Sequence, residues 1–272
     1  MKTDIFLKNN ITIHNDNEGK KPMLFVHGYG CDQHMWRHVV PAFQDQFKII
    51  LIDLVGSGKS DWNAYDYEKY SHLQAHADDI IAICEALALS NTTLVCHSVS
   101  CMIGLLAAIK KPNYFESVLM ITPSPCYINK ENYIGGFSQT DIDDLLENLD
   151  SNYLGWSSAI APVIMGNSER PELANELENS FCQNDPKIAK HFARVTFLGD
   201  NRQDLAKMTV PSLVIQCQQD VIAPIEVGRY LETHLPFTTL HIINANGHCP
   251  HLSHPEETIN AMQNFLNQKS HD

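Results

Sequence analysis

The segment Thr92-Thr93-Leu94-Val95-Cys96-His97-Ser98-Val99-Ser100-Cys101-Met102 decides the fold. Its first half is an apolar run rich in strand-forming residues, and a helical pattern of apolar residues follows at once, through Ile109. Ser98 therefore stands where a strand turns into a helix. Such a turn, a nucleophile elbow, lifts the serine hydroxyl above the sheet and points the N-terminus of the helix at it.

This elbow departs from the usual spelling G-x-S-x-G, because Cys96 and Ser100 stand where the two glycines are expected. Small residues are needed there, since strand and helix crowd against the turn. Cysteine and serine are small, so the pattern is weakened but kept. An exposed serine at a strand-to-helix junction is also common, and this segment alone leaves both a catalytic and a structural role open.

Length and composition indicate one large α/β domain with an insertion, because the chain has 272 residues and 44% hydrophobic content. A formal net charge of −13 argues against nucleic acid and anionic membranes as partners. The chain starts without an apolar stretch typical of a signal peptide, and no apolar run is long enough to span a membrane. We therefore expect a cytoplasmic protein.

Cysteine and histidine are frequent, but their patterns do not favour disulfides or a metal. The eight cysteines form no C-x-x-C, and several lie inside apolar runs, so we expect reduced thiols. His248, His251 and His254 are spaced three apart but interrupted by prolines, which would not hold three imidazoles on one helical face. The sequence thus predicts neither a metal nor a cofactor.

Apolar runs typical of buried strands alternate with helical patterns along most of the chain. This alternation is typical of a parallel sheet covered by helices. Asp32 is expected to begin a helix that runs through Val40. The expected strands span residues 5–13, 22–26, 48–53, 92–97, 117–121, 211–217 and 238–243, and further helices are expected over 70–89 and 255–266.

The rhythm changes between residues 125 and 205, where four helical patterns occur without a strand-like run. They are expected to begin near Ser138, Asn152, Pro171 and Asp185. The region carries 13 acidic and 6 basic side chains, and each helix has one apolar face. An insertion of this kind is typical of a cap over an active site. We expect a core of residues 1–124 and 206–272 and a four-helix cap of residues 125–205, inserted after the strand that ends near Thr122.

Three residues with complementary chemistry each follow a separate predicted strand. Ser98, Asp220 and His248 occur in the chain order of the catalytic triad of α/β hydrolases. In such a triad the histidine takes the serine proton, and the aspartate orients the imidazole. The loop His27-Gly28-Tyr29-Gly30 follows another strand, so the N–H groups of Tyr29 and Val99 are the predicted oxyanion hole.

Longer motifs carry a family resemblance that covers nearly the whole chain. They are Gly28-Tyr29-Gly30-Cys31-Asp32-Gln33 with Trp36, Val55-Gly56-Ser57-Gly58-Lys59-Ser60-Asp61, Pro123-Ser124-Pro125-Cys126-Tyr127, Tyr153-Leu154-Gly155-Trp156, and Gly247-His248-Cys249-Pro250-His251 with Ser253-His254-Pro255. The chain resembles the RsbQ family, bacterial α/β hydrolases similar to the plant strigolactone and karrikin receptors. The resemblance implies a mostly parallel sheet flanked by helices, a V-shaped four-helix cap and a small apolar pocket over the serine.

The resemblance also implies a function. Members of this family act as positive regulators of the sigma-B general stress pathway, together with a PAS-domain phosphatase, through hydrolysis of a small hydrophobic compound. Together with the apolar faces of the cap, it suggests that Tyr29, Phe137, Trp156 and Phe197 line the pocket. Two alternatives stay open: a metabolic carboxylesterase, and a ligand-binding receptor or interaction module whose hydrolysis is incidental.

Overall fold

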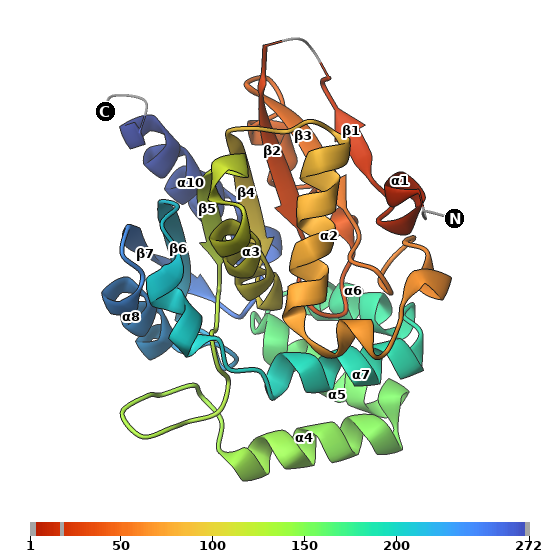
Figure 1. Cartoon of the computed structure of the whole chain (residues 1–272). Coiled ribbons are helices and arrows are strands. Elements are labelled where there is room, and N and C mark those ends of the chain that lie inside the picture. Colours follow the sequence, from red (N-terminus) through yellow and green to blue (C-terminus); the bar gives the residue numbers. More distant parts are fainter. Residues whose placement is uncertain (1–3, 17–18, 270–272) are drawn as a thin grey trace.

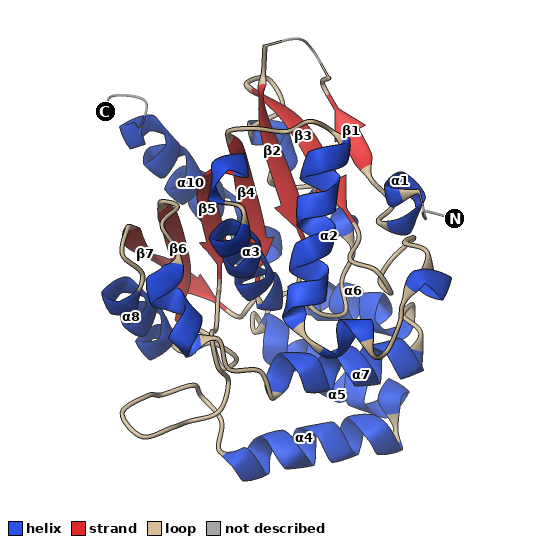
Figure 2. Ribbon diagram, in the orientation of Figure 1, coloured by secondary structure: helices blue, strands red, loops and turns tan. Residues whose placement is uncertain are grey.

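The computed structural model describes residues 4–16 and 19–269, and a seven-stranded sheet runs through its centre (Figures 1 and 2). The strand order is β1-β3-β2-β4-β5-β6-β7; β1 pairs antiparallel with β3, and the other neighbours are parallel. This confirms the expected mostly parallel sheet. The strands are β1 Thr12–His14, β2 Lys21–Val26, β3 Phe47–Ile52, β4 Thr92–His97, β5 Phe115–Ile121, β6 Ser212–Gln219 and β7 Thr238–Asn246.

Helices cover both faces of the sheet. α2 (Leu73–Ala86) packs on α3 (Val99–Lys110), which lies against β4 and β5, while α10 (Pro255–Lys269) packs on β6 and β7 and lies behind the sheet in Figure 1. α8 (Ile225–His234) also contacts β6 and β7. The short helical turns are η3 Trp62–Ala64, η4 Lys69–Ser71, η5 Pro112–Tyr114, η6 Arg202–Lys207 and α9 Pro250–Ser253.

The N-terminal strand expected over residues 5–13 is wrong in its first half. Asp4 accepts a hydrogen bond from the backbone N–H of Phe6 and starts a helical turn, α1 (Ile5–Lys8). Asn10 then takes a positive φ of 42°, which ends that turn, and only β1 is extended. A side-chain cap at Asp4 thus outweighed the strand propensity of the apolar residues.

The helix expected from Asp32 to Val40 is also wrong in type. Asp32 does cap a helical segment, since its carboxylate accepts from the N–H of His34, but the segment is a 3₁₀ helix, η1 (Gln33–Trp36). A second 3₁₀ helix, η2 (Val40–Ala42), contains Pro41. Because proline lacks an N–H and restricts the preceding residue, a continuous α-helix does not form.

Four helices follow β5, as the sequence predicted, and lie at the carboxyl ends of the parallel strands (Figure 1). They are α4 Gln139–Ser151, α5 Tyr153–Met165, α6 Pro171–Cys182 and α7 Pro186–Phe197. Ser138, Asn152 and Asp185 each accept a hydrogen bond from the first turn of their helix. α5 packs on α6, and α4 contacts both α5 and α7. We refer to residues 125–205 as the cap.

The described helices include none that is both long and apolar enough to cross a membrane.

The junction of β4 and α3 has the strained geometry of an elbow. β4 is buried along its whole length, and Ser98 takes φ 56° and ψ −124°, in a region that non-glycine residues rarely occupy. A Cβ atom built on Gly104 of α3 would lie 2.7 Å from Sγ of Cys96. The crowding that the usual elbow relieves with a glycine on the strand is therefore relieved here by a glycine on the helix.

This contact predicts energetic coupling between the two positions. Gly104→Ala is expected to lower the free energy of unfolding by about 1–3 kcal/mol, because the added methyl group overlaps Cys96. In a Cys96→Gly background, Gly104→Ala is expected to lower the free energy of unfolding by at least about 1 kcal/mol less than it does in the parent. Urea unfolding of the two single variants and the double variant measures this difference. Equal costs of Gly104→Ala in both backgrounds would contradict the assignment.

Candidate active site

The structure brings together Ser98, His248 and Asp220, which follow β4, β7 and β6 respectively. Nε2 of His248 lies 2.8 Å from Oγ of Ser98, and Nδ1 lies 2.7 Å from Oδ2 of Asp220. A carboxylate only accepts, so Nδ1–H donates to Asp220 and Nε2 is left as the acceptor of the serine proton. All three residues are buried. This is the hydrogen-bond arrangement of a catalytic triad, in which the histidine can take the serine proton and the aspartate stabilises the resulting imidazolium.

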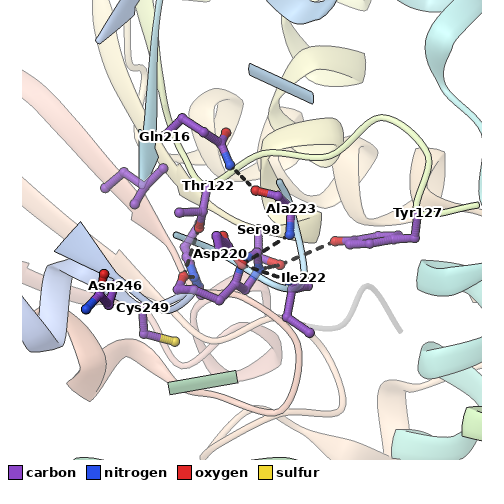
Figure 3. Close-up of polar contacts among 12 residues, drawn as sticks. Ser98, Thr122, Tyr127, Gln216, Asp220, Ile222, Ala223, Asn246 and Cys249 are labelled. Atoms are coloured by element: carbon purple, nitrogen blue, oxygen red, sulfur yellow. Dashed lines mark hydrogen bonds and ion pairs between the residues drawn. The ribbon is translucent and has the colours of Figure 1, made fainter. Parts of the chain in front are cut away.

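The carboxylate of Asp220 is held by backbone groups as well. Its second oxygen, Oδ1, accepts hydrogen bonds from the N–H groups of Ile222 at 2.8 Å and Ala223 at 3.1 Å (Figure 3). The turn after β6 therefore uses one oxygen for its own backbone and aims the other at His248. Rotation of the carboxylate would break both sets of bonds at once.

Two residues that the sequence did not single out hold the backbone of His248. Its carbonyl oxygen accepts from Nε2 of His97 and from the hydroxyl of Thr122, each at 2.9 Å. Thr122 takes a φ of 47°, an unusual value for a β-branched residue, directly after β5. Because His97 ends β4 and Thr122 follows β5, residues of neighbouring strands position the backbone of the catalytic histidine. Only the spatial arrangement reveals these partners.

The predicted oxyanion donors, the backbone N–H groups of Tyr29 and Val99, belong to the loop after β2 and to the elbow. Within the described residues neither N–H donates a hydrogen bond, and Val99 is the first residue of α3, where helical N–H groups lack partners. A Cβ atom on Gly28 would lie 3.2 Å from Cβ of Ser98 and 2.4 Å from Nδ1 of His97. The loop that carries Tyr29 therefore packs directly on the elbow, where an oxyanion would form.

Hydrogen bonds fix the conformation of this loop. Nε2 of His27 accepts from the N–H of Leu54 at 3.0 Å, so Nδ1–H donates to the carbonyl of Gly28 at 2.8 Å. The hydroxyl of Ser100 donates to the carbonyl of His27. Ser100, which replaces the second glycine of the elbow, thus connects the elbow to the loop that carries Tyr29.

Comparisons with known proteins agree with this geometry. The model of the alpha/beta hydrolase fold family matches residues 21–255. The chain belongs to this family. It is 34% identical to the karrikin insensitive 2 receptor IA of Petunia hybrida, over 98% of this chain and 96% of that protein, and 32% identical to the strigolactone esterase D14 of Arabidopsis thaliana, over 91% and 93%.

Solved structures place the hydrolase in the same family. A hydrolase from Oleispira antarctica is 39% identical, superimposes with a TM-score of 0.94, and the alignment covers 97% of this chain and 96% of that one. An esterase from Exiguobacterium antarcticum has a TM-score of 0.86 at 18% identity, covers 94% of each chain and supports the fold. Family and triad together make the protein a serine hydrolase.

Three of the four predicted pocket residues of this hydrolase lie in one aromatic cluster. The ring centroid of Tyr29 lies 6.3 Å from that of Trp156 and 6.1 Å from that of Phe197. Phe181 and Phe192, which the prediction omitted, complete the cluster at 6.0 Å and 5.9 Å from Tyr29. The aromatic residues come from α5, α6 and α7, so the cap supplies most of the apolar surface over the elbow.

Phe137, the fourth predicted residue, does not join this cluster. It lines a hollow of about 840 Å³ beside α4 and α5, which Trp156 also lines. Tyr127, by contrast, was missed as a site residue. Its hydroxyl lies 3.4 Å from Oγ of Ser98 (Figure 3), and its ring lies 5.2 Å from that of Phe197. Burial raises the pKa of Tyr127, so the hydroxyl stays neutral and can donate a hydrogen bond at the site.

His251 lies behind the triad and has a packing role. Its ring packs at a tilt against Trp36 and His97, with centroid distances of 4.8 Å and 4.4 Å. Neither ring nitrogen has a hydrogen-bond partner among the described residues, and burial lowers the pKa of His251 from 6.5 to about 3. In the described part of the chain, no group of three or more His, Cys, Asp or Glu residues could hold a metal ion.

The buried imidazole predicts a loss of stability in acid. Between pH 6.5 and about 3, His251 is protonated in the unfolded chain and neutral in the folded one, so the free energy of unfolding falls as pH falls. His251→Leu, which is similar in size, removes this contribution. Between pH 7 and pH 5, we expect the free energy of unfolding to fall by about 2 kcal/mol less in the variant than in the parent. Urea unfolding at both pH values is the measurement, and equal losses would contradict the prediction.

Proposed function

We propose that this hydrolase cleaves small, uncharged carboxylic esters or lactones, with Ser98 as the nucleophile. The observation that carries the proposal is the complete Ser98, His248 and Asp220 arrangement beneath an aromatic cluster. Its similarity to strigolactone esterases of plants supports the proposal.

The geometry supports a two-step reaction. Oγ of Ser98 attacks the substrate carbonyl while Nε2 of His248 takes its proton, and the oxyanion is bound by the N–H groups of Tyr29 and Val99. The imidazolium gives this proton to the leaving oxygen as the ester bond breaks, which leaves an acyl group on Ser98. A water molecule, deprotonated by His248, then attacks the acyl group and releases the carboxylic acid and the free serine.

The surroundings favour neutral substrates. The aromatic side chains around Tyr29 offer no charged partner to a substrate group, and burial of an unpaired charge is costly. Asp141 and Asp144 line the hollow beside α4 and α5 that Trp156 joins to the cluster. If substrates enter there, the two carboxylates disfavour anions. Compact apolar acyl groups fit this description best.

The finer biological role rests on the sequence resemblance and on relatives named as receptors. We extend the proposal to a cytoplasmic regulator of the RsbQ type, which promotes stress signalling together with a PAS-domain phosphatase. The similarity to the Petunia receptors favours a second candidate, a ligand-binding receptor with incidental hydrolysis. The two candidates differ in whether turnover at Ser98 is needed for signalling.

Replacement of the triad residues tests the chemistry. Ser98→Ala is expected to abolish hydrolysis of p-nitrophenyl acetate and butyrate without unfolding the protein, because it removes one hydroxyl and creates no large cavity. His248→Ala and Asp220→Asn are each expected to lower kcat about a thousandfold or more, and the losses should not add, because the residues act as a unit. Initial rates and circular dichroism measure both effects. Retention of most activity by Ser98→Ala would refute the proposal.

A cellular experiment separates the regulator from the receptor. The signal is measured in stress-reporter strains that carry the phosphatase. One strain expresses the parent protein, one expresses Ser98→Ala, and one expresses charge reversals at Asp143 and Glu147, two exposed residues of α4. We expect both variants to lose the signal, because the product is made at Ser98 and the cap contacts the partner. A full signal with Ser98→Ala would favour the receptor. Normal signalling in both variants would favour a metabolic esterase.

A further inference from the structure

The turn between α5 and α6 lies on the loop that carries His248. We call residues 246–253 the histidine loop. The N–H of His248 donates to the carbonyl of Ile164 in α5 at 2.8 Å. A Cβ atom on Gly247 would lie 1.9 Å from the carbonyl oxygen of Met165, so cap and loop meet backbone to backbone. The catalytic histidine is therefore in direct contact with the cap.

Asn167 joins the two segments through its side-chain amide. Nδ2 donates to the carbonyl of Met165 and to the carbonyl of Asn246, each at 2.9 Å. The side chain is buried, and the residue takes a φ of 55°, which asparagine tolerates better than most residues. One amide group thus connects the end of α5 to the start of the histidine loop.

Arg170 holds the other end of the same loop. Its Nη1 donates to the carbonyl of Ser253 at 2.7 Å, and its Nη2 donates to Oδ1 of Asn167 at 2.8 Å. Because arginine only donates, it fixes the amide of Asn167 with Nδ2 toward the carbonyls. Asn167 and Arg170 together form a clamp across both ends of the histidine loop.

We propose that Asn167 and Arg170 are positioning residues that keep the imidazole of His248 aligned with Ser98. The inference rests on the proposed function, since it assumes that His248 is the catalytic base. The core holds the carbonyl of His248 through His97 and Thr122, its imidazole through Asp220, and the N–H of Gly247 through Gln219. The cap adds the bond to the N–H of His248 and the bonds to both ends of its loop. Displacement of the cap would therefore remove three of the backbone contacts that position the base, while its bond to Asp220 remains.

Three variants and one control test the clamp. Asn167→Asp keeps the acceptor for Arg170 but replaces Nδ2, which donates both hydrogen bonds, with an oxygen that faces the two carbonyls. Asn167→Gly tolerates the positive φ and removes the amide. Arg170→Lys keeps the charge but cannot bridge Ser253 and Asn167. Tyr65→Phe is the control, because it removes a cap contact remote from the histidine loop, the 2.8 Å hydrogen bond between Tyr65 and His191.

We expect both Asn167 variants to lower kcat for p-nitrophenyl acetate by about ten- to a hundredfold, with KM within about threefold, because small displacements of a catalytic group are costly. Arg170→Lys is expected to have a smaller effect in the same direction. The downfield proton resonance of Nδ1–H in His248 should broaden in the Asn167 variants. In Tyr65→Phe, both kcat and the linewidth of this resonance should stay within about twofold of the parent values.

Other outcomes would overturn the inference. Unchanged kcat in folded Asn167→Asp and Asn167→Gly would mean that the clamp does not position His248. An equal loss of kcat in Tyr65→Phe, in step with a lower Tm, would assign the effect to cap stability in general. Failure of the proposed function is recognised separately, because the parent would then show no hydrolysis that depends on Ser98.

Discussion

The hydrogen bond between Nε2 of His248 and Oγ of Ser98 joins segments 150 residues apart, and the structure around it is arranged to make it possible. Parallel pairing of β4 to β7 brings the carboxyl ends of these strands to one edge of the sheet. The positive φ of Ser98 raises its hydroxyl above that edge, and Thr122 adopts a strained conformation nearby to hold His248. Burial of the apolar strands outweighs the cost of these strained residues.

The cap completes the site as well as covering it. The hydroxyl of Tyr29 donates to the carbonyl of Ala189 in α7, and its ring packs against side chains of three cap helices. His248 donates its N–H to Ile164 in α5. Tyr29 and the base are thus both bonded to the cap. The position of the cap and the placement of the catalytic histidine are therefore linked by direct contacts.

The departures at the elbow have a tertiary explanation. Cys96 is accommodated because Gly104 leaves room on the facing helix, and Ser100 contributes a hydrogen bond to the loop that carries Tyr29. The motif G-x-S-x-G describes one common way to make space between the strand and the helix, with a glycine on each side of the serine. This chain reaches the same turn with a different distribution of small residues, so the relevant constraint is the space between β4 and α3.

The sequence by itself determined the sheet, the four cap helices, the elbow and the three triad residues, because apolar periodicity, helix caps and strand-end residues are local signals. It misassigned the first half of residues 5–13 and the helix type over residues 32–40, where Asp4 and Pro41 changed the local conformation. Only the tertiary structure decided that Phe137 lies apart from the aromatic cluster, that Tyr127, His97 and Thr122 belong to the site, and that Asn167 and Arg170 hold the histidine loop. These contacts join residues far apart in the chain, and their geometry follows from how helices and loops pack, which no local pattern encodes.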